Sequence, residues 1–170
     1  MKIKTGKVAE KDLIAQYLPS DYTEVLQCVF FSEKNITPDD IQVAFWTNSP
    51  QWIKKMFKLR DILVKPLGIK PGNENDKLEL AKSIRLGENY RFISIPAKSI
   101  HETLLCMNDK HLVMYFSAKI ISETGDKKKL TITTLVNFHN LLGRLYFYII
   151  YPFHCIIVKS MIKNAVSIVQ

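Results

Sequence analysis

The stretch that decides the fold is HNLLGRLYFYIIYPFHCIIVKSMIK, residues 139–163, near the end of a chain of 170 residues. Between Arg144 and Lys159 it contains no Asp, Glu, Lys or Arg. Such a segment can be a membrane span, a helix buried in the core, or the helical wall of a cavity. Each of these alternatives leads to a different fold, so the fold depends on which of them this stretch forms.

Three features of the stretch argue against a membrane span. The uncharged part covers only residues 145–158, whereas a spanning helix needs about 20 apolar residues. Pro152 removes a backbone hydrogen bond and predicts a kink, and His154 would be costly to place in lipid. We therefore predict a long helix, largely buried against a sheet, in a protein that is not transmembrane.

The segments before this helix predict one strand and two short helices. Residues 21–31 are rich in β-branched and aromatic residues and predict a strand. Thr37 is a good N-cap before Pro38, and a helix follows to about Trp46. A second helix begins near Pro50 and carries Trp52, Met56 and other apolar residues at helical spacing until Pro66 and Gly68 end it. The turn-rich loop 70–77 comes next, and residues 77–90 remain ambiguous.

The second half of the chain predicts an antiparallel sheet. Residues 111–122 and 129–138 alternate between two faces and are joined by ETGDKK (123–128), which predicts a hairpin. Residues 90–98 and 99–107 are shorter strand candidates, and Pro96 indicates an edge strand or a bulge. The order of elements predicts a single α+β domain over residues 1–170. This order resembles the helix-grip arrangement of START-like and polyketide-cyclase-like proteins, in which a curved antiparallel sheet wraps around one long C-terminal helix.

Composition restricts the classes of partner and cofactor. A net charge of +8 would suit nucleic acid or an anionic membrane, but the charges are scattered and no nucleic-acid-binding motif occurs. The three cysteines have no zinc-site spacing, which predicts free thiols in a reducing compartment and no metal site. No phosphate-binding or nucleotide-binding motif implies a cofactor. The N-terminus has lysines but no apolar signal region, so we expect a cytoplasmic location.

Three segments together resemble a known bacterial family. They are WIKKMFKLRDILVKPLGIK (52–70), NDKHL (108–112) and HNLLGRLYFYIIYPFHCIIV (139–158). This combination resembles the family described as domain of unknown function 2867, and the resemblance covers nearly the whole chain. It implies a helix-grip fold and no established reaction. The chain departs from the family pattern after NDKHL, where VMYF (113–116) replaces an acidic residue followed by an aromatic–Arg pair.

Histidine and arginine side chains are the first candidates for a site. Arg144 could clamp a carboxylate or phosphate, or it could form a structural ion pair with Asp109 or Asp61. His111 follows Asp109, which is a pattern compatible with general-base chemistry and also with a simple turn. His154 could point into a cavity, or its ring could bond a backbone carbonyl released by the preceding proline.

Tyrosine hydroxyls near these residues could orient a polar head group in an apolar pocket, although core tyrosines with their tips at the surface are the more frequent arrangement. The predicted ligand-binding residues are Tyr115, Arg144, Tyr146, Tyr148, Tyr151, His154 and His111. The favoured function is binding of a small hydrophobic or amphipathic ligand without catalysis. One alternative is a cyclase-like or hydrolase-like enzyme in the same cavity. Another is docking of an anionic membrane or acidic partner, either on Lys54, Lys55, Lys58 and Arg60 or on the DKKK loop (126–129).

Overall fold

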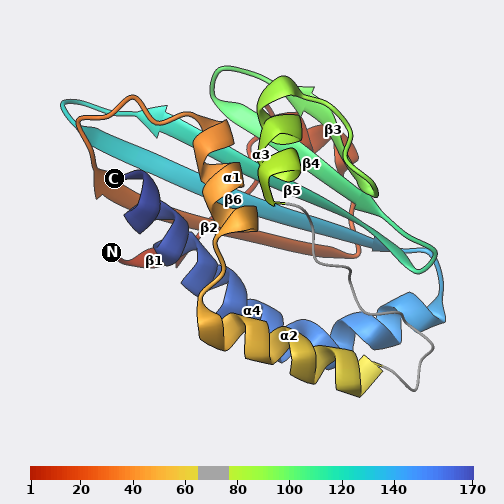
Figure 1. The fold of residues 1–170 in the computed structure, drawn as a ribbon. Coiled ribbons are helices and arrows are strands. Elements are labelled where there is room, and N and C mark those ends of the chain that lie inside the picture. Colours follow the sequence, from red (N-terminus) through yellow and green to blue (C-terminus); the bar gives the residue numbers. More distant parts are fainter. Residues whose placement is uncertain (65–76) are drawn as a thin grey trace.

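The computed structural model describes residues 1–64 and 77–170, without some side chains of one helix, and centres on a six-stranded antiparallel sheet in the order β1-β2-β6-β5-β4-β3 (Figure 1). The strands are β1 (Ile3–Thr5), β2 (Tyr22–Phe31), β3 (Ile93–Lys98), β4 (Glu102–Asn108), β5 (Leu112–Ser122) and β6 (Lys127–Phe138). The helices are the 3₁₀ helix η1 (Leu13–Tyr17), α1 (Pro38–Thr47), α2 (Gln51–Val64), α3 (Lys77–Leu86) and α4 (Leu141–Val169). The predicted α+β class, with a long C-terminal helix packed against an antiparallel sheet, is confirmed.

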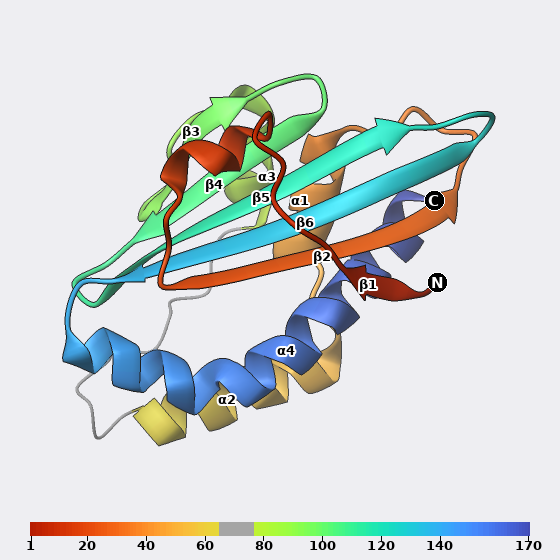
Figure 2. The same cartoon turned by 180° about the vertical axis from the view of Figure 1, so that it is seen from behind.

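The sheet has helices on one face and the N-terminal segment on the other. Helices α1, α3 and α4 lie on what we call the inner face, and α2 lies alongside α4 (Figure 1). Residues 6–20, which include η1, cross the outer face (Figure 2). Ile14 of η1 is fully buried there beside Leu104 and Leu135. The buried Glu102 carboxylate accepts hydrogen bonds from the backbone N–H groups of Leu13 and Ile14 at 2.7 and 3.3 Å, which fixes η1 on the sheet.

The two halves of α4 are packed very differently. The second half contributes buried residues to the main core with α1 and the sheet; they are Ile157, Val158, Met161, Ile162, Ala165 and Val166. The first half is far more exposed, and the helix continues through Pro152. Within the described residues, α4 is the one helix long and apolar enough to cross a membrane, and only 28% of its most apolar window is buried. Core helices of soluble proteins can pass the same test, so this is weak evidence about a membrane.

Local signals in the sequence explain several element boundaries. Thr37 Oγ1 accepts a hydrogen bond from Asp40 N at 3.2 Å, and the Asp40 carboxylate accepts one from Thr37 N at 3.0 Å, which completes a capping box. Gly125 has a φ of 66° in the predicted hairpin turn between β5 and β6. Pro96 lies on the edge strand β3, where the register shifts between Ser94 and Ala97. These predictions are confirmed.

Other features differ from the sequence-based expectations. Strand β1 and helix η1 were not predicted, and the ambiguous residues 77–90 contain α3. Trp52, expected on the packed face of α2, is 41% exposed, while Ile53 is fully buried. The helix stop at Pro66 and Gly68 and the loop up to residue 76 lie outside the described residues, as do the side chains of Lys54, Phe57, Arg60, Asp61, Leu63 and Val64.

Candidate functional site

Two of the segments that carry the family resemblance, NDKHL (108–112) and HNLLG (139–143), meet where α4 begins. The backbone N–H of His139 donates to the carbonyl of His111 at 2.9 Å. Asn140 Nδ2 donates to the carbonyl of Lys110 at 3.0 Å, and His139 Nε2 lies 2.9 Å from Asn108 Oδ1. The turn between β4 and β5 is therefore bonded directly to the start of α4, although about 30 residues separate the motifs in the sequence.

Asn140 and Gly143 explain why α4 begins at this place. Asn140 is the N-cap, and its Oδ1 accepts a hydrogen bond from the backbone N–H of Gly143 at 2.9 Å. Gly143 is buried, and a Cβ atom added to it would lie 2.0 Å from the carbonyl oxygen of His111. Only glycine allows the helix to approach the turn so closely. These residues position α4, and their contacts are structural.

Arg144 and His111 lie at this junction, near the surface. Arg144 Nη2 is 3.9 Å from Asp21 Oδ1, and its side chain is 55% exposed. The Asp109 carboxylate instead accepts hydrogen bonds from the backbone N–H groups of His111 and Leu112, at 2.6 and 3.0 Å. Asp21 thus lies in the place proposed for Asp109 as a partner of Arg144, while the Asp61 side chain lies outside the described residues. The buried Nδ1 of His111 has no hydrogen-bond partner in the described structure.

His154 forms the centre of a second, more sheltered cluster. His154 Nε2 lies 3.1 Å from Oε2 of Glu24 on β2, and the two side chains are only 17% and 13% exposed. The ring of Tyr22, two residues before Glu24 on the same strand face, lies 5.9 Å from the His154 ring. Neither Glu24 nor Tyr22 was predicted from the sequence. The sequence contained one sign of Glu24: an acidic residue at this position lies on the same face of the strand as the apolar residues Leu26 and Phe30.

Tyr151 belongs to the same cluster, which is closed by aromatic rings. The Tyr22 ring lies 4.7 Å from the Phe147 ring and 5.7 Å from the Tyr151 ring, measured between centroids. Burial, followed by the negative charge of Glu24, raises the pKa of Tyr22 well above its usual value. A hydrogen bond with Cys155 is the main cause that raises the pKa of Tyr151. Both hydroxyls therefore stay protonated at neutral pH and can donate hydrogen bonds.

The remaining predicted tyrosines lie elsewhere. Tyr115 is on the outer face, where its ring stacks on Tyr17 at a centroid distance of 3.9 Å. Burial is the main cause that raises its pKa. Tyr146 is buried on α4, and Tyr148 is 64% exposed. Of the predicted ligand-binding residues, the structure thus brings together Tyr151 and His154, places His111 and Arg144 at the start of α4, and puts Tyr115 on the opposite face of the sheet.

The inner face of the sheet is sealed at one end and half-open at the other. Phe116 and Ile132 face the second half of α4 and are 2% and 1% exposed. On β5, the next two side chains on this face toward the first half of α4, Met114 and Leu112, are only half-buried. On β6, Thr134 and Val136 are still buried, and Phe138 at the end of the strand is half-buried. Met107, which pairs with Met114 across β4 and β5, is also half-buried. Half-buried apolar side chains on an inner face mark a place that the helices leave incompletely covered.

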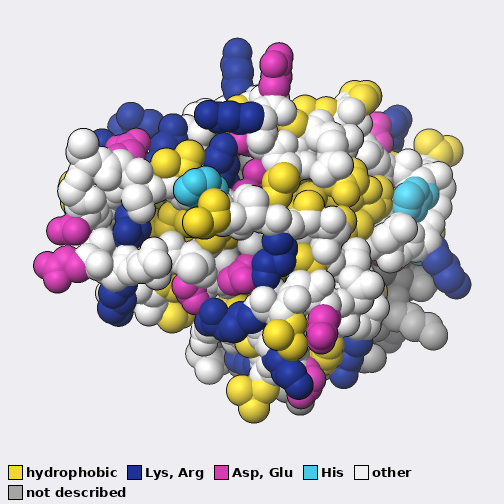
Figure 3. All heavy atoms as spheres, turned by 90° about the horizontal axis from the view of Figure 1, so that it is seen from above, with side chains coloured by type: hydrophobic (Ala, Val, Ile, Leu, Met, Phe, Trp, Pro, Cys, Tyr) yellow, Lys and Arg dark blue, Asp and Glu magenta, His cyan; other side chains and the backbone are white. Residues whose placement is uncertain are grey.

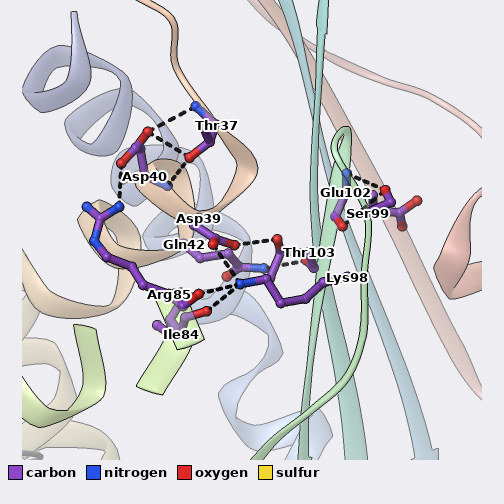
Figure 4. Close-up of polar contacts among 10 residues, drawn as sticks. All are labelled: Thr37, Asp39, Asp40, Gln42, Ile84, Arg85, Lys98, Ser99, Glu102 and Thr103. Carbon is purple, nitrogen blue, oxygen red and sulfur yellow. Dashed lines mark hydrogen bonds and ion pairs between the residues drawn. The ribbon is translucent and has the colours of Figure 1, made fainter. Parts of the chain in front are cut away.

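A third polar cluster joins α1, α3 and β3, and its groups satisfy one another (Figure 4). Lys98 Nζ donates to Asp39 Oδ2 at 2.7 Å and to the carbonyls of Ile84 and Arg85 at 2.8 and 2.9 Å. Thr103 Oγ1 donates to the other carboxylate oxygen of Asp39 at 2.6 Å. Every donor and acceptor of this ion pair is engaged, so the cluster is a structural tie between the elements.

Two hollows lie outside these clusters. One, of about 530 Å³, is lined by residues 8–13, 15, 16 and 18 of the N-terminal segment. The other, of about 330 Å³, lies between α1, α3 and the end of α4, and its lining includes Asp40, Arg85 and Val169. Neither hollow is lined by a predicted ligand-binding residue. In the described part of the chain, no group of three or more His, Cys, Asp or Glu side chains could hold a metal ion.

Comparison with known proteins identifies the family. The chain belongs to the family of proteins of unknown function DUF2867, which matches residues 19–161. This range includes β2 with Glu24, the NDKHL turn, the start of α4 and His154. No curated protein and no solved structure matches the chain.

Proposed function

We propose that this member of the DUF2867 family binds a small hydrophobic or amphipathic ligand, without catalysis, between the half-open end of the inner face and the first half of α4. The observation that carries the proposal is the incomplete burial of Leu112, Met114 and Phe138 at one end of strand faces whose central residues are buried. A ligand that covers apolar surface left partly open inside a fold removes that surface from water, which makes binding favourable. The resemblance to helix-grip proteins is part of this proposal.

The polar groups beside this region give the ligand an orientation. Glu24 and His154 form a sheltered hydrogen-bonded pair, and the hydroxyls of Tyr22 and Tyr151 lie on the same cluster of rings. A ligand with an apolar body and one polar head group would place the head at this pair and the body against the methionines. Methionine side chains adapt to irregular shapes, which suits a ligand of variable outline.

The second candidate function is acid–base catalysis at the same place. It is favoured by one observation, the 3.1 Å contact between His154 and Glu24 in a sheltered position, because a carboxylate can orient an imidazole for proton transfer. The pair also has a sufficient structural explanation, since it ties α4 to β2. Ligand binding without turnover therefore remains the first proposal.

The first test is native mass spectrometry of the gently purified protein, followed by extraction of co-purifying molecules after denaturation. We expect a stoichiometric mass that is lost on denaturation and that belongs to a molecule with an apolar body. The extract also serves as the substrate candidate for the catalytic alternative. Conversion of that molecule by the protein, abolished in His154→Gln, would replace binding by catalysis as the function.

A matched pair of variants locates the site with an apolar fluorescent probe. Met114→Trp fills the half-open end of the inner face, whereas Tyr115→Trp changes the adjacent residue of β5 on the outer face. We expect Met114→Trp to weaken probe binding at least about tenfold, because the larger ring occupies the apolar volume, and Tyr115→Trp to leave it unchanged. Equal effects in two variants that retain the thermal stability of the wild type would place the binding site elsewhere.

A further inference from the structure

The outward face of the first half of α4 is an exposed apolar stripe. Leu141, Leu145, Tyr148, Pro152 and Ile156 recur at intervals of three or four residues and therefore lie on one side of the helix. Leu141 is 81% exposed, Leu145 51%, Tyr148 64% and Ile156 60%. A water-soluble helix normally places polar residues on its outer face, so this stripe requires another explanation.

The charges along α4 are of a single sign. The helix contains Arg144, Lys159 and Lys163 and no acidic residue over Leu141–Val169. Lys159 and Lys163 continue the stripe at the same helical spacing and are exposed. The face of the molecule turned away from α2 is different, because acidic and basic side chains are interspersed there (Figure 3).

The neighbouring helix α2 adds groups of the same chemistry. It lies alongside the first half of α4 in both ribbon views (Figures 1 and 2). Its exposed residues include Lys55, Lys58 and the large apolar side chains Trp52 and Ile62. Exposed tryptophan and tyrosine side chains beside lysines are typical of protein surfaces that lie in the headgroup region of a bilayer.

We infer that the stripe on α4 docks on the surface of an anionic lipid bilayer, with the helix in the headgroup plane and its apolar side chains directed into the lipid. The lysines at the end of the stripe and on α2 then face anionic headgroups, which attract basic residues near a membrane. A second copy of this chain fits less well. Symmetric pairing would set α4 against a helix without acidic residues, so the lysines would find no opposite charge. This inference does not rest on the proposed ligand site.

Flotation with lipid vesicles tests the inference. The vesicles are made of phosphatidylcholine alone or of phosphatidylcholine mixed with phosphatidylserine. Ile156→Glu places a negative charge in the stripe, and Ile100→Glu makes the same change at the turn before β4, where Ile100 is 83% exposed. Both positions are exposed, so both variants are expected to retain the fold, which circular dichroism verifies.

We expect the wild type to float with the phosphatidylserine vesicles more strongly than with phosphatidylcholine alone. Ile156→Glu should reduce this binding at least about tenfold, because it removes an inserted apolar side chain and adds repulsion from the lipid, whereas Ile100→Glu should stay within about twofold. Lys159→Gln with Lys163→Gln should weaken binding to the anionic vesicles by about tenfold or more and bring it close to that of neutral vesicles.

Three results would overturn the inference. The first is a wild type that binds neither vesicle composition. The second is an Ile156→Glu variant that floats as strongly as the wild type. The third is size-exclusion chromatography that shows a wild-type dimer and an Ile156→Glu monomer, with no vesicle binding by either protein. That third result would assign the stripe to an interface between copies of the chain.

Discussion

Replacing Gly143 by alanine should destabilise the protein, although glycine-to-alanine changes inside helices usually do the opposite. Alanine is favoured over glycine in a helix by about 1 kcal/mol. At Gly143, however, the added Cβ would lie 2.0 Å from the carbonyl oxygen and 2.7 Å from the carbonyl carbon of His111. These are backbone atoms of the turn between β4 and β5, so a side-chain rotation cannot relieve the overlap.

The magnitude follows from what must move. Displacing backbone to accommodate an added methyl group costs about 1–3 kcal/mol. The same displacement would weaken the hydrogen bonds from His139 N to the His111 carbonyl and from Asn140 Nδ2 to the Lys110 carbonyl, each worth about 1 kcal/mol. Subtracting the helix-propensity gain leaves a net loss of about 2 kcal/mol in the free energy of unfolding. For a chain of this length, that loss lowers Tm by about 4–8 °C.

Thermal and urea denaturation followed by circular dichroism measure this loss. Gly6→Ala is the matched control, because the nearest atom to its added Cβ is the side-chain Cδ of Gln27 at 2.8 Å, part of a flexible side chain that can move aside. We expect Gly6→Ala to change the stability by no more than about 0.5 kcal/mol. A Gly143→Ala variant as stable as the wild type, or more stable, would refute the assignment of the HNLLG motif to a close structural contact.

Three further predictions test the core and its titratable groups. Gln42 is fully buried, donates to the carbonyls of Thr103 and Phe116 and accepts from Trp46 Nε1. Gln42→Ala leaves a cavity and unpaired polar groups, so it should lower the free energy of unfolding, measured by urea titration, by about 3 kcal/mol. Folding raises the pKa of Tyr22 above the unfolded value of 10.0, so this phenol stabilises the fold fully below about pH 10 and progressively less as the pH rises above it. Tyr22→Phe should therefore reduce the fall of Tm between neutral and alkaline pH. Burial raises the pKa of Cys28 to about 11 against an ordinary 9.0, so its thiolate fraction near pH 8 is about a hundredfold smaller than that of an ordinary thiol. Titration with an aromatic disulfide reagent should show one slowly reacting thiol, and this slow phase should be missing in Cys28→Ser.

The regular elements were predictable because their signals are local. Alternation along residues 111–122 and 129–138 and a glycine in the connecting turn are sufficient to specify β5, β6 and their hairpin. Thr37 and Asp40 specify the start of α1 by contacts within four residues. Strand β1 was missed because three residues carry no periodicity and depend on pairing with β2. Helix η1 was missed because its first N–H groups are bonded by Glu102, about 90 residues away.

The candidate site was harder to predict because its contacts are not local. His154 was recognised as a polar residue on an apolar helix, but its partner Glu24 lies 130 residues earlier in the chain. Tyr115, by contrast, was placed with the other tyrosines by residue type, and the pairing of β5 with β4 and β6 puts it on the opposite face of the sheet. Residue type predicts which chemistry is available, whereas the sheet register decides which side chains meet.

The packing of α4 at its two ends bears on both proposals made for its first half. Contacts with the NDKHL turn fix residues 139–143 at one end, and the core fixes Ile157–Val166 at the other. Between these two ends, the helix does not need to pack against other elements on either face in order to stay in position. One side can therefore face the half-open end of the sheet with Tyr151 and His154, while the other presents the apolar stripe. A helix held rigidly at both ends can leave apolar surface available for a ligand or a bilayer without losing its place in the fold.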